Sequence, residues 1–523
     1  MPPKLRISSG RSWQVAACIL LGFTCLLVAL QFATHRRTSP DEAMNALFAQ
    51  RVVRGQSLAI PSAVTPDQLA AFAPRSVVIR DGRMLPGSFV GFDLVIGHIQ
   101  ARLGTNGPAL ALAFLAAVAM GCWYLIVRRY WEPSWAWLSV LLLLFHPAFL
   151  QFMTLPYFHA GWFTALLIIT GYALLRYQER PNWRTAIWVG LTAGAALFIR
   201  PSEVLWVGPA LAVVMVARPR GWLWLCIAAP IVLAMQIPWL VIDHHLYGSF
   251  FATGYTPSGI DGLVTTAQHG GWWSIVTPAG GHWGWSFWRH AWDFVVLQFP
   301  VYSALTAVTL VVYFRRKFFS WWKVLKIGSI VALAVYVLAY YGTWELYSHV
   351  TAAQVGTLAS YVRYWLPLVV AMSAGVVVAM RGVAHMSARF ASVIVLCVVI
   401  GNIAVTFLHP ASGWLQRRSD QQQEAARRSV ALSYIPTNGF LFAGSDDKLF
   451  VADRSVSYQY PSTPTAWQLA GEIARKQPTY ILVDPRAVSL STFSDAAMQA
   501  GLQMQPLATV QGNQLYQLNS IAL

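Results

Sequence analysis

The sequence is poor in charge. Only 11% of its 523 residues are charged, compared with about 25% in soluble domains. Acidic residues are the scarcest, since 20 Asp and Glu stand against 37 Lys and Arg and give a net charge of +17. Hydrophobic residues make up 56% of the chain, and the mean hydropathy is +0.50. These values exclude an ordinary soluble domain and indicate a membrane protein.

Cysteine is also scarce. The chain has five cysteines, and all of them fall inside apolar runs, where they are most simply small core residues. A disulfide framework and a cysteine metal site are therefore not expected. Internal repeats and long low-complexity tracts are absent from the sequence as well. The cysteines are Cys18, Cys25, Cys122, Cys226 and Cys397.

Long apolar runs recur along the chain, near or above the roughly 20 residues that cross a bilayer. They predict a mainly α polytopic bundle of about eleven spans. The first run is an anchor and not a signal peptide, because it is too long and no small-x-small cleavage site follows. The predicted spans are 13–34, 109–127, 134–152, 160–175, 185–199, 203–217, 222–241, 298–314, 324–343, 365–380 and 390–408.

Positive charge predicts the orientation. With the N-terminus inside, the predicted cytoplasmic segments hold 17 of the 37 basic residues against two acids, Glu132 and Glu179. This is the positive-inside pattern, so the net charge reflects topology and nucleic acid is not an expected partner. An odd number of spans places the residues after 408 outside. The predicted cytoplasmic segments are 1–12, 128–133, 176–184, 216–221, 315–326 and 381–389.

Two domains are expected, a transmembrane core over 1–408 and a small extracytoplasmic α/β domain over 409–523. In the tail, the sequence predicts strands over 439–444 and 479–484 and a helix over 465–477. Apolar and polar residues alternate again near 514–518, as in a strand. The tail has no P-loop and no nucleophile elbow. Its Asp446-Asp447 pair is interpreted as a solvated turn in preference to a catalytic pair.

Arginines break the positive-inside pattern at the external mouths of two spans. Arg200 lies before the sixth span, and Arg363 lies among aromatic residues at the start of the tenth. Each could anchor the interface by snorkelling. Each could also bind a phosphate, because the guanidinium fork matches phosphate oxygens.

The first external loop, 35–108, opens with Ser39-Pro40-Asp41-Glu42. Ser, then Pro, with Glu three positions after the Ser, predicts a helix start with a capping box, and Gly55 can end the helix. We expect an amphipathic helix lying on the membrane. Capping explains Glu42 well. It explains Asp41 less well, because Asp41 stays on the membrane-facing stripe and is a candidate base.

A second turn leads into a helix later in the same loop. Pro86-Gly87-Ser88-Phe89 precedes Gly91, Phe92 and Asp93. Three arginines come before the turn and could hold a lipid phosphate or anionic headgroups, of which headgroup contact is preferred. They are Arg75, Arg80 and Arg83.

The second long external loop, 242–297, is rich in aromatic residues and glycine. Tyr255, Trp283 and Trp285 could stack on sugar rings, and glycine lets the backbone approach closely. An aromatic belt at the membrane interface explains the same residues equally well. No spacing of His, Asp or Glu in the loop predicts a metal site.

Taken in order, several segments resemble the GT-C glycosyltransferases, in the branch of protein O-mannosyltransferases and lipid A aminoarabinose transferases. The resemblance covers most of residues 10–410 and rests on the order of the segments more than on any one motif. They are the acidic pair within Ser39–Gly55, the segments Pro86–Gly104, Ala193–Glu203 and Asp243–Tyr255, and Arg363-Tyr364-Trp365-Leu366-Pro367.

The resemblance implies transfer of a sugar from a polyprenyl-phosphate donor to a glycan, lipid or protein acceptor outside the membrane. It implies that Asp41 is the catalytic base and that Arg363 lies near the donor phosphate. Beside these two, Glu42 is kept as a second catalytic candidate, and Arg200 and Arg83 are kept as further candidates for binding the donor phosphate. Two departures stand out. The loop 146–161 has no acid and offers Tyr157 and His159 for sugar or acceptor, and Pro86-Gly87 replaces a Lys-Pro found in some relatives.

We therefore expect an inverting glycosyltransferase of the bacterial inner (plasma) membrane, with a cytoplasmic N-terminus and an extracytoplasmic tail. No cofactor is assigned, a divalent metal is left open, and no metal ligand is named. An envelope polysaccharide polymerase or ligase is the alternative; it would depend on external arginines and not on Asp41. A lipid-linked sugar transporter would need repeated halves and charges within spans.

Overall fold

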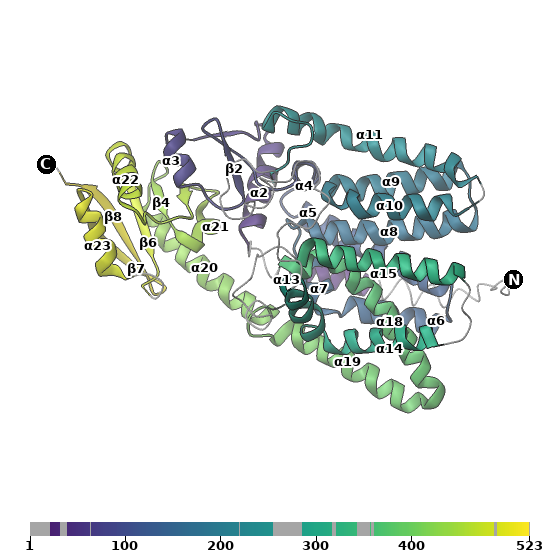
Figure 1. Ribbon diagram of the computed structural model, residues 1–523. Coiled ribbons are helices and arrows are strands. Elements are labelled where there is room, and N and C mark those ends of the chain that lie inside the picture. The colour runs from purple at the N-terminus through teal and green to yellow at the C-terminus, as the bar shows by residue number, and fades with distance from the viewer. Residues whose placement is uncertain are drawn as a thin grey trace. The chain divides into compact units, whose positions relative to one another are not determined.

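The computed structural model is described for residues 21–31, 39–62, 64–218, 220–254, 285–315, 321–342, 356, 360–485 and 489–521. It is mainly helical (Figure 1). The chain divides into two compact units, which are described separately. The first unit holds Met1–Ala33, Asn106–Gln236 and Thr266–Gln416; the second holds Thr34–Thr105, Ile237–Thr265 and Arg417–Leu523.

The first unit is built from apolar helices. Five helices in the described part of the chain are long and apolar enough to cross a membrane, or seven if two bent pairs each count as one span. Every predicted span coincides with a helix, but several helices are short, so the count of eleven stays a prediction. The helices are Leu21–Gln31, α5 (Gly107–Arg128), α6 (Pro133–Leu144), α7 (Pro147–Met153), α8 (His159–Glu179), α9 (Trp183–Ile199), α10 (Val204–Val216), α11 (Gly221–Tyr247), α13 (Trp285–Ala291), α14 (Pro300–Arg315), α15 (Trp321–Gly342), α17 (Ser360–Tyr364), α18 (Leu366–Met386) and α19 (Ala388–Leu408).

Proline lies at two sharp bends of the first unit, one inside the predicted span 134–152 and one at the start of the predicted span 298–314. Pro147 begins α7 directly after His146, and α6 and α7 meet at 68°. Pro300 begins α14 after a π-helical turn over Trp292–Leu297, and the bend there is 102°. Proline lacks the amide that would continue the preceding helix, so each run becomes two segments.

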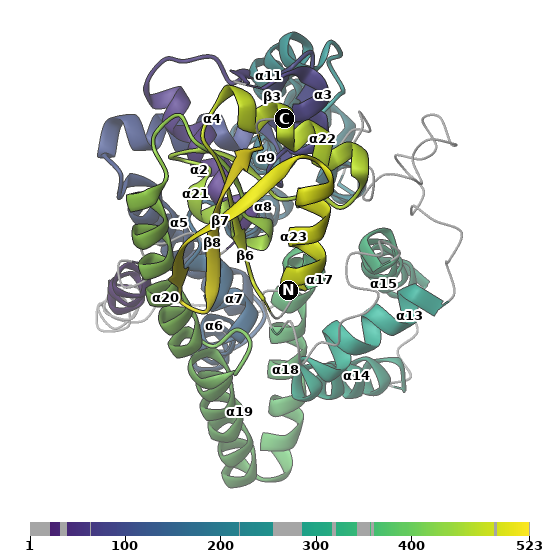
Figure 2. The ribbon, with the colours of Figure 1, turned by 90° about the vertical axis from the view of Figure 1, so that its left-hand side faces the viewer.

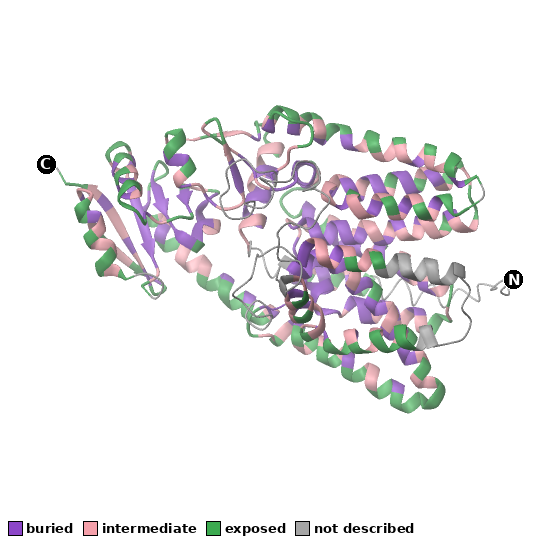
Figure 3. Cartoon of the chain, in the orientation of Figure 1, coloured by how far each residue is buried: buried purple, intermediate pink, exposed green. Residues whose placement is uncertain are grey.

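Small residues bring neighbouring helices together. A Cβ on Gly190 of α9 would lie 2.9 Å from the Ala228 carbonyl oxygen of α11. Gln236 donates from Nε2 to the Gly194 carbonyl at 3.1 Å. Close approach at small residues is how membrane helices pack. Figure 3 shows α8 largely buried, whereas α11 and α19 expose most of their length, as lipid-facing helices would.

The second unit contains the first external loop and most of the tail. Its helix α2 (Pro40–Val53) begins where Ser39-Pro40 predicts, with the Glu42 amide donating to the Ser39 hydroxyl at 3.2 Å. Gly55, at φ +62°, follows its end. The expectation of an amphipathic helix lying on the membrane is wrong. Ala43, Met44, Ala46 and Phe48 are all buried, since α2 packs on α4 (Val90–Leu103) and within an apolar core.

A three-stranded antiparallel sheet, ordered β1-β3-β2, lies between α2 and α4 in the sequence. Asp81-Gly82, at φ +50° and +68°, joins β2 to β3, and these positive angles suit a tight primed turn. The turn was not predicted, although Asp-Gly between two apolar runs is a hairpin signal. The strands are β1 (Ile60–Pro61), β2 (Val77–Arg80) and β3 (Arg83–Pro86). The short helix α3 (Pro66–Ala71) lies between β1 and β2 in the sequence.

The tail forms a five-stranded mixed sheet, ordered β5-β4-β6-β8-β7, with β5, β4 and β6 parallel (Figure 2). The predicted strands and helix correspond to β4, β6, β8 and α22. The other elements were not predicted. The elements are α20 (Trp414–Tyr434), β4 (Phe440–Phe442), α21 (Asp447–Phe450), β5 (Ser455–Ser457), α22 (Pro464–Lys476), β6 (Thr479–Val483), α23 (Leu490–Gln499), β7 (Leu502–Val510) and β8 (Asn513–Ser520).

The Asp446-Asp447 pair follows β4, with Asp447 as the first residue of α21, and is buried, so its interpretation as a solvated turn is wrong. Arg75 binds Asp447 at 2.5 Å, and Arg427 binds Asp446 at 2.6 Å. These ion pairs compensate for the burial of the two carboxylates. Asn513 adds a hydrogen bond to Asp446 at 3.1 Å.

Candidate functional site

Asp41 lies in the first turn of α2 and has a defined partner. The Ser76 hydroxyl donates to Asp41 Oδ1 at 2.5 Å. Ser76 comes directly before β2 and has φ +60°, a left-handed conformation that serine seldom adopts. Strain of this kind is found where the surrounding structure holds a functional side chain in place.

A second contact fixes the backbone of Ser76. The Gly87 amide donates to the Ser76 carbonyl at 3.1 Å. A Cβ on Gly87 would lie 2.4 Å from that carbonyl oxygen, so no larger residue fits without a shift. Pro86-Gly87 stands where some relatives have Lys-Pro. Because Gly87 has no side chain, it lets two backbone segments approach closely beside Asp41.

Glu42 is placed differently from Asp41. Its amide donates to the Ser39 hydroxyl, which caps α2, and its side chain is buried, at 3% exposure. It also lies within electrostatic range of Arg417. Burial lowers the pKa of Arg417 to about 10, and Glu42 opposes that decrease. The Ser39 cap is therefore confirmed, while the roles of the Glu42 side chain in capping and in catalysis stay predictions.

Two buried carboxylates in the second unit were not predicted as site residues. Asp93 of α4 and Asp243 of α11 are 0% and 1% exposed, and both act electrostatically on Tyr247. Among the described residues, neither oxygen of Asp93 has a hydrogen-bond partner. Burial raises the pKa of Asp93 well above its ordinary value. The signal that could have shown it is an acid inside the apolar stretch Phe92-Asp93-Leu94.

The two predicted phosphate-binding arginines, Arg200 and Arg363, lie in one buried network in the first unit. Arg200 and Glu203 are each 1% exposed and form an ion pair at 2.6 Å. The Tyr341 hydroxyl donates to Glu203 at 2.5 Å and accepts from Arg200 at 3.3 Å. Trp206 also donates to Glu203. Glu203 is thus held by three donors, which a buried carboxylate requires.

Aromatic rings join the two arginines. Arg363 donates from Nη2 to the Tyr364 hydroxyl at 2.9 Å and lies 4.8 Å from the centre of that ring. Arg200 lies 5.2 Å from the centre of the same ring. The Tyr341 and Tyr364 rings stack at 4.4 Å. Both guanidinium groups therefore interact with Tyr364 at cation–π distance.

Within the described residues, the network contains two guanidinium groups and one carboxylate, that of Glu203. Nε and Nη1 of Arg200 have no hydrogen-bond acceptor in the described part of the chain. Buried charged donors without acceptors are costly, so an anion with several oxygen atoms would stabilise this site.

The predicted sugar and acceptor residues are only partly described. His159 begins α8, is 1% exposed and lies within electrostatic range of Arg200 and Arg363. Tyr157, two residues earlier, is half-buried. Tyr255 and Trp283 lie outside the described residues. Trp285 begins α13, but its side chain also lies outside them.

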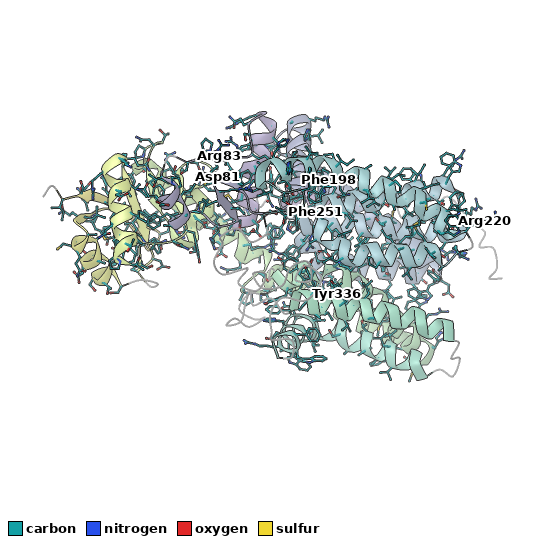
Figure 4. All side chains as sticks on the ribbon, turned by 45° about the horizontal axis from the view of Figure 1, so that its top comes forward. Asp81, Arg83, Phe198, Arg220, Phe251 and Tyr336 are labelled. Carbon is teal, nitrogen blue, oxygen red and sulfur yellow. The ribbon has the colours of Figure 1, made fainter. Side chains whose placement is uncertain are left out.

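Arg83 is exposed at the start of β3, next to the turn of Asp81 (Figure 4). It is not part of the buried arginine network, and its role stays a prediction. Among the residues that the structure describes, no three His, Cys, Asp or Glu side chains form a group that could hold a metal ion.

Comparison with known proteins identifies the fold. The family model for dolichyl-phosphate-mannose-protein mannosyltransferase matches residues 102–242. No curated protein sequence matches the chain. The crystal structure of ArnT from Cupriavidus metallidurans, bound to undecaprenyl phosphate, is 12% identical and has a TM-score of 0.57; the match covers 97% of this chain and 98% of that one.

A second match is the oligosaccharyltransferase AglB from Archaeoglobus fulgidus, in complex with an inhibitory peptide and a dolichol-phosphate. It is 12% identical, the TM-score is 0.48, and the match covers 97% of this chain and 74% of that one. With the match to ArnT and the matching family model, the predicted resemblance is confirmed: the chain is an integral membrane protein with the fold of the GT-C glycosyltransferases.

Proposed function

We propose that the protein transfers a sugar from a polyprenyl-phosphate donor to an acceptor on the outer face of the membrane. The observation that carries the proposal is the buried network of Arg200, Arg363 and Glu203, in which Nε and Nη1 of Arg200 have no acceptor in the described part of the chain. A phosphate monoester or diester offers the oxygen atoms that guanidinium groups bind best. The ArnT structure, whose fold the chain shares, holds undecaprenyl phosphate.

In the proposed reaction, Asp41 accepts the proton of the acceptor hydroxyl. The acceptor oxygen attacks the anomeric carbon, and the bond from that carbon to the phosphate oxygen breaks on the opposite face. The configuration is therefore inverted, and polyprenyl phosphate leaves without needing a general acid. One general base contributes roughly 10²–10⁴ in rate. Arg200 and Arg363 stabilise the charge that grows on the departing phosphate.

Other residues have supporting roles in this proposal. Tyr364 holds the two guanidinium groups, and Tyr157 and His159 are proposed to contact the sugar or acceptor. Arg83 is proposed to contact lipid headgroups, because it is exposed. The distribution of basic residues supports the proposed external position of Asp41. The inner membrane is the proposed location.

The test uses purified full-length protein in lipid nanodiscs. Undecaprenyl phosphate is expected to bind, and undecaprenol, which lacks the phosphate, is expected to bind much more weakly. A panel of undecaprenyl-phosphate hexoses and pentoses is then incubated with and without envelope extract. Sugar loss that needs both the protein and the extract supports a transferase. Equal binding of the phosphate and the alcohol would contradict the assigned phosphate site.

A further inference from the structure

The tail contacts the loop that carries the partner of Asp41, and both belong to the second unit. Asp447, the first residue of α21, accepts from the Arg75 main-chain amide at 2.8 Å. It also accepts from Arg75 Nε at 3.1 Å and from Nη2 at 2.5 Å. Arg75 Nη2 donates further to the Ser445 carbonyl at 2.7 Å. The main chain and the side chain of Arg75 are therefore both held by the tail.

Two more contacts strengthen this attachment. The Arg75 guanidinium lies 4.6 Å from the centre of the Tyr458 ring, and the Tyr458 amide donates to the Ala73 carbonyl at 3.3 Å. The Asp447 side chain is 1% exposed. A buried, charge-assisted set of hydrogen bonds with several donors fixes geometry much better than an exposed ion pair does.

Ser76 follows Arg75 directly. It is held in a left-handed backbone conformation, and its hydroxyl donates to Asp41 Oδ1 at 2.5 Å. Its carbonyl is fixed from the other side by Gly87. Few backbone arrangements satisfy all these contacts, so the position of the Ser76 hydroxyl depends on the attachment of Arg75.

We propose that Ser76 is a positioning residue for Asp41 and that the tail sets its position through Asp447 and Arg75. The role of Asp41 as base rests on the proposed function. A donor on Oδ1 orients the carboxyl group and stabilises its ionised form, which is the form a general base needs. The tail therefore acts in catalysis through Ser76 without touching the reacting atoms.

The first test replaces Ser76 by glycine, which adopts the same backbone conformation without strain and removes the side chain that carries the hydroxyl. With the undecaprenyl-phosphate sugar that the wild-type protein consumes, Ser76→Gly is expected to lower kcat by roughly 10- to 100-fold. The acidic limb of its pH profile should move to higher pH, and KM for the donor should change little.

Asp81→Gly is the matched control. Asp81 also has a positive φ, but it is exposed in the hairpin turn that joins β2 to β3 (Figure 4). Its kcat and pH profile should equal those of the wild type. An unchanged pH profile in Ser76→Gly, with Asp41→Asn inactive, would overturn the role of Ser76 and leave the base assignment intact. An active Asp41→Asn variant would overturn the base assignment itself.

The second test needs no substrate. Asp447→Ala and Asp446→Ala each remove one buried ion pair of the tail, but only Asp447 contacts Arg75. In hydrogen exchange on the full-length protein, Asp447→Ala should speed exchange of the amides in 73–78 by roughly tenfold. Asp446→Ala should leave these amides near the wild-type rate. Equal exchange in the two variants would overturn the coupling through Asp447.

Discussion

The guanidinium of Arg200 is almost fully buried, with Glu203 as its ion-pair partner and Arg363 nearby. Its number of donors matters as well as its charge, because Nη2 is used by Glu203 and Tyr341 while Nε and Nη1 have no acceptor among the described residues. Nε and Nη1 lie on different edges of the planar group, so each can donate to an anion oxygen while Nη2 keeps its partners. Lysine has the charge but offers a single nitrogen in place of these separate donors.

Arg200→Lys is therefore expected to weaken binding of undecaprenyl phosphate by roughly 10- to 100-fold. The matched control is Arg220→Lys, since Arg220 is an exposed arginine of the same unit, in a predicted cytoplasmic loop (Figure 4). Its affinity should equal that of the wild type. The measurement is a titration with undecaprenyl phosphate in nanodiscs, and wild-type affinity of Arg200→Lys would contradict the assigned site.

Asp93 gives a prediction about stability. Burial raises its pKa in the folded protein above the ordinary value of 3.8. The stability that depends on the neutral carboxyl is therefore complete below about pH 4 and is lost as pH rises toward the folded-state pKa. Asp93→Asn removes this loss, so it should raise the free energy of unfolding at pH 8. Each unit of pKa increase is worth about 1.4 kcal/mol.

Thermal unfolding of the wild type and of Asp93→Asn at pH 4 and pH 8 checks this expectation. The difference between the two proteins should be larger at pH 8. A destabilised Asp93→Asn variant at pH 8 would show instead that the carboxylate is ionised and bound to a cation in the folded protein.

At the scale of elements, the turn over Pro86-Gly87 fits against Ser76 and needs a residue without a side chain. Gly87→Ala would bring a Cβ to 2.4 Å from the Ser76 carbonyl. Overpacking of this kind costs about 1–3 kcal/mol. We expect a lower unfolding temperature and reduced transfer, because Ser76 moves away from Asp41.

Gly55→Ala is a useful comparison. Gly55 has positive φ and open space around it, so its substitution strains the backbone without touching Ser76. It should lower stability while leaving kcat per folded molecule near the wild-type value. Equal loss of kcat in both variants would contradict the role given to the Ser76 contact.

The helices that hold the candidate residues could be predicted because residues next to each helix start determine where it begins. Ser39-Pro40 sets the start of α2, and Pro86-Gly87 precedes α4. The burial of α2 could not be predicted, since it depends on α4 and the tail, which are distant in the sequence. The partnership of Asp41 with Ser76 is likewise a tertiary contact, over 35 residues. The grouping of Arg200 with Arg363 was expected only from the family resemblance.

At the scale of the whole chain, the distribution of basic residues predicts the side of the membrane on which each loop lies. Arg128 ends α5 and Arg129 follows it on the predicted cytoplasmic side, whereas Asp81 belongs to the predicted external loop. The structure describes these segments but contains no membrane, so the orientation needs its own measurement.

Labelling of single introduced cysteines tests the orientation. In intact spheroplasts, a membrane-impermeant maleimide is expected to label Asp81→Cys and to leave Arg129→Cys unlabelled until the cells are lysed. The five native cysteines lie in predicted spans, and the unmodified protein gives the background. Labelling of Arg129→Cys in intact cells would reverse the predicted topology and remove Asp41 from the outer face.

The most direct test of the proposed transfer compares Asp41→Asn with Asp81→Asn, a substitution of an exposed acid in the same loop. Both variants should bind undecaprenyl phosphate as the wild type does. With a consumed undecaprenyl-phosphate sugar and acceptor extract present, Asp81→Asn should transfer at the wild-type rate, and Asp41→Asn should lose roughly 10²–10⁴ in rate. Wild-type transfer by Asp41→Asn would contradict the assignment of Asp41 as the base.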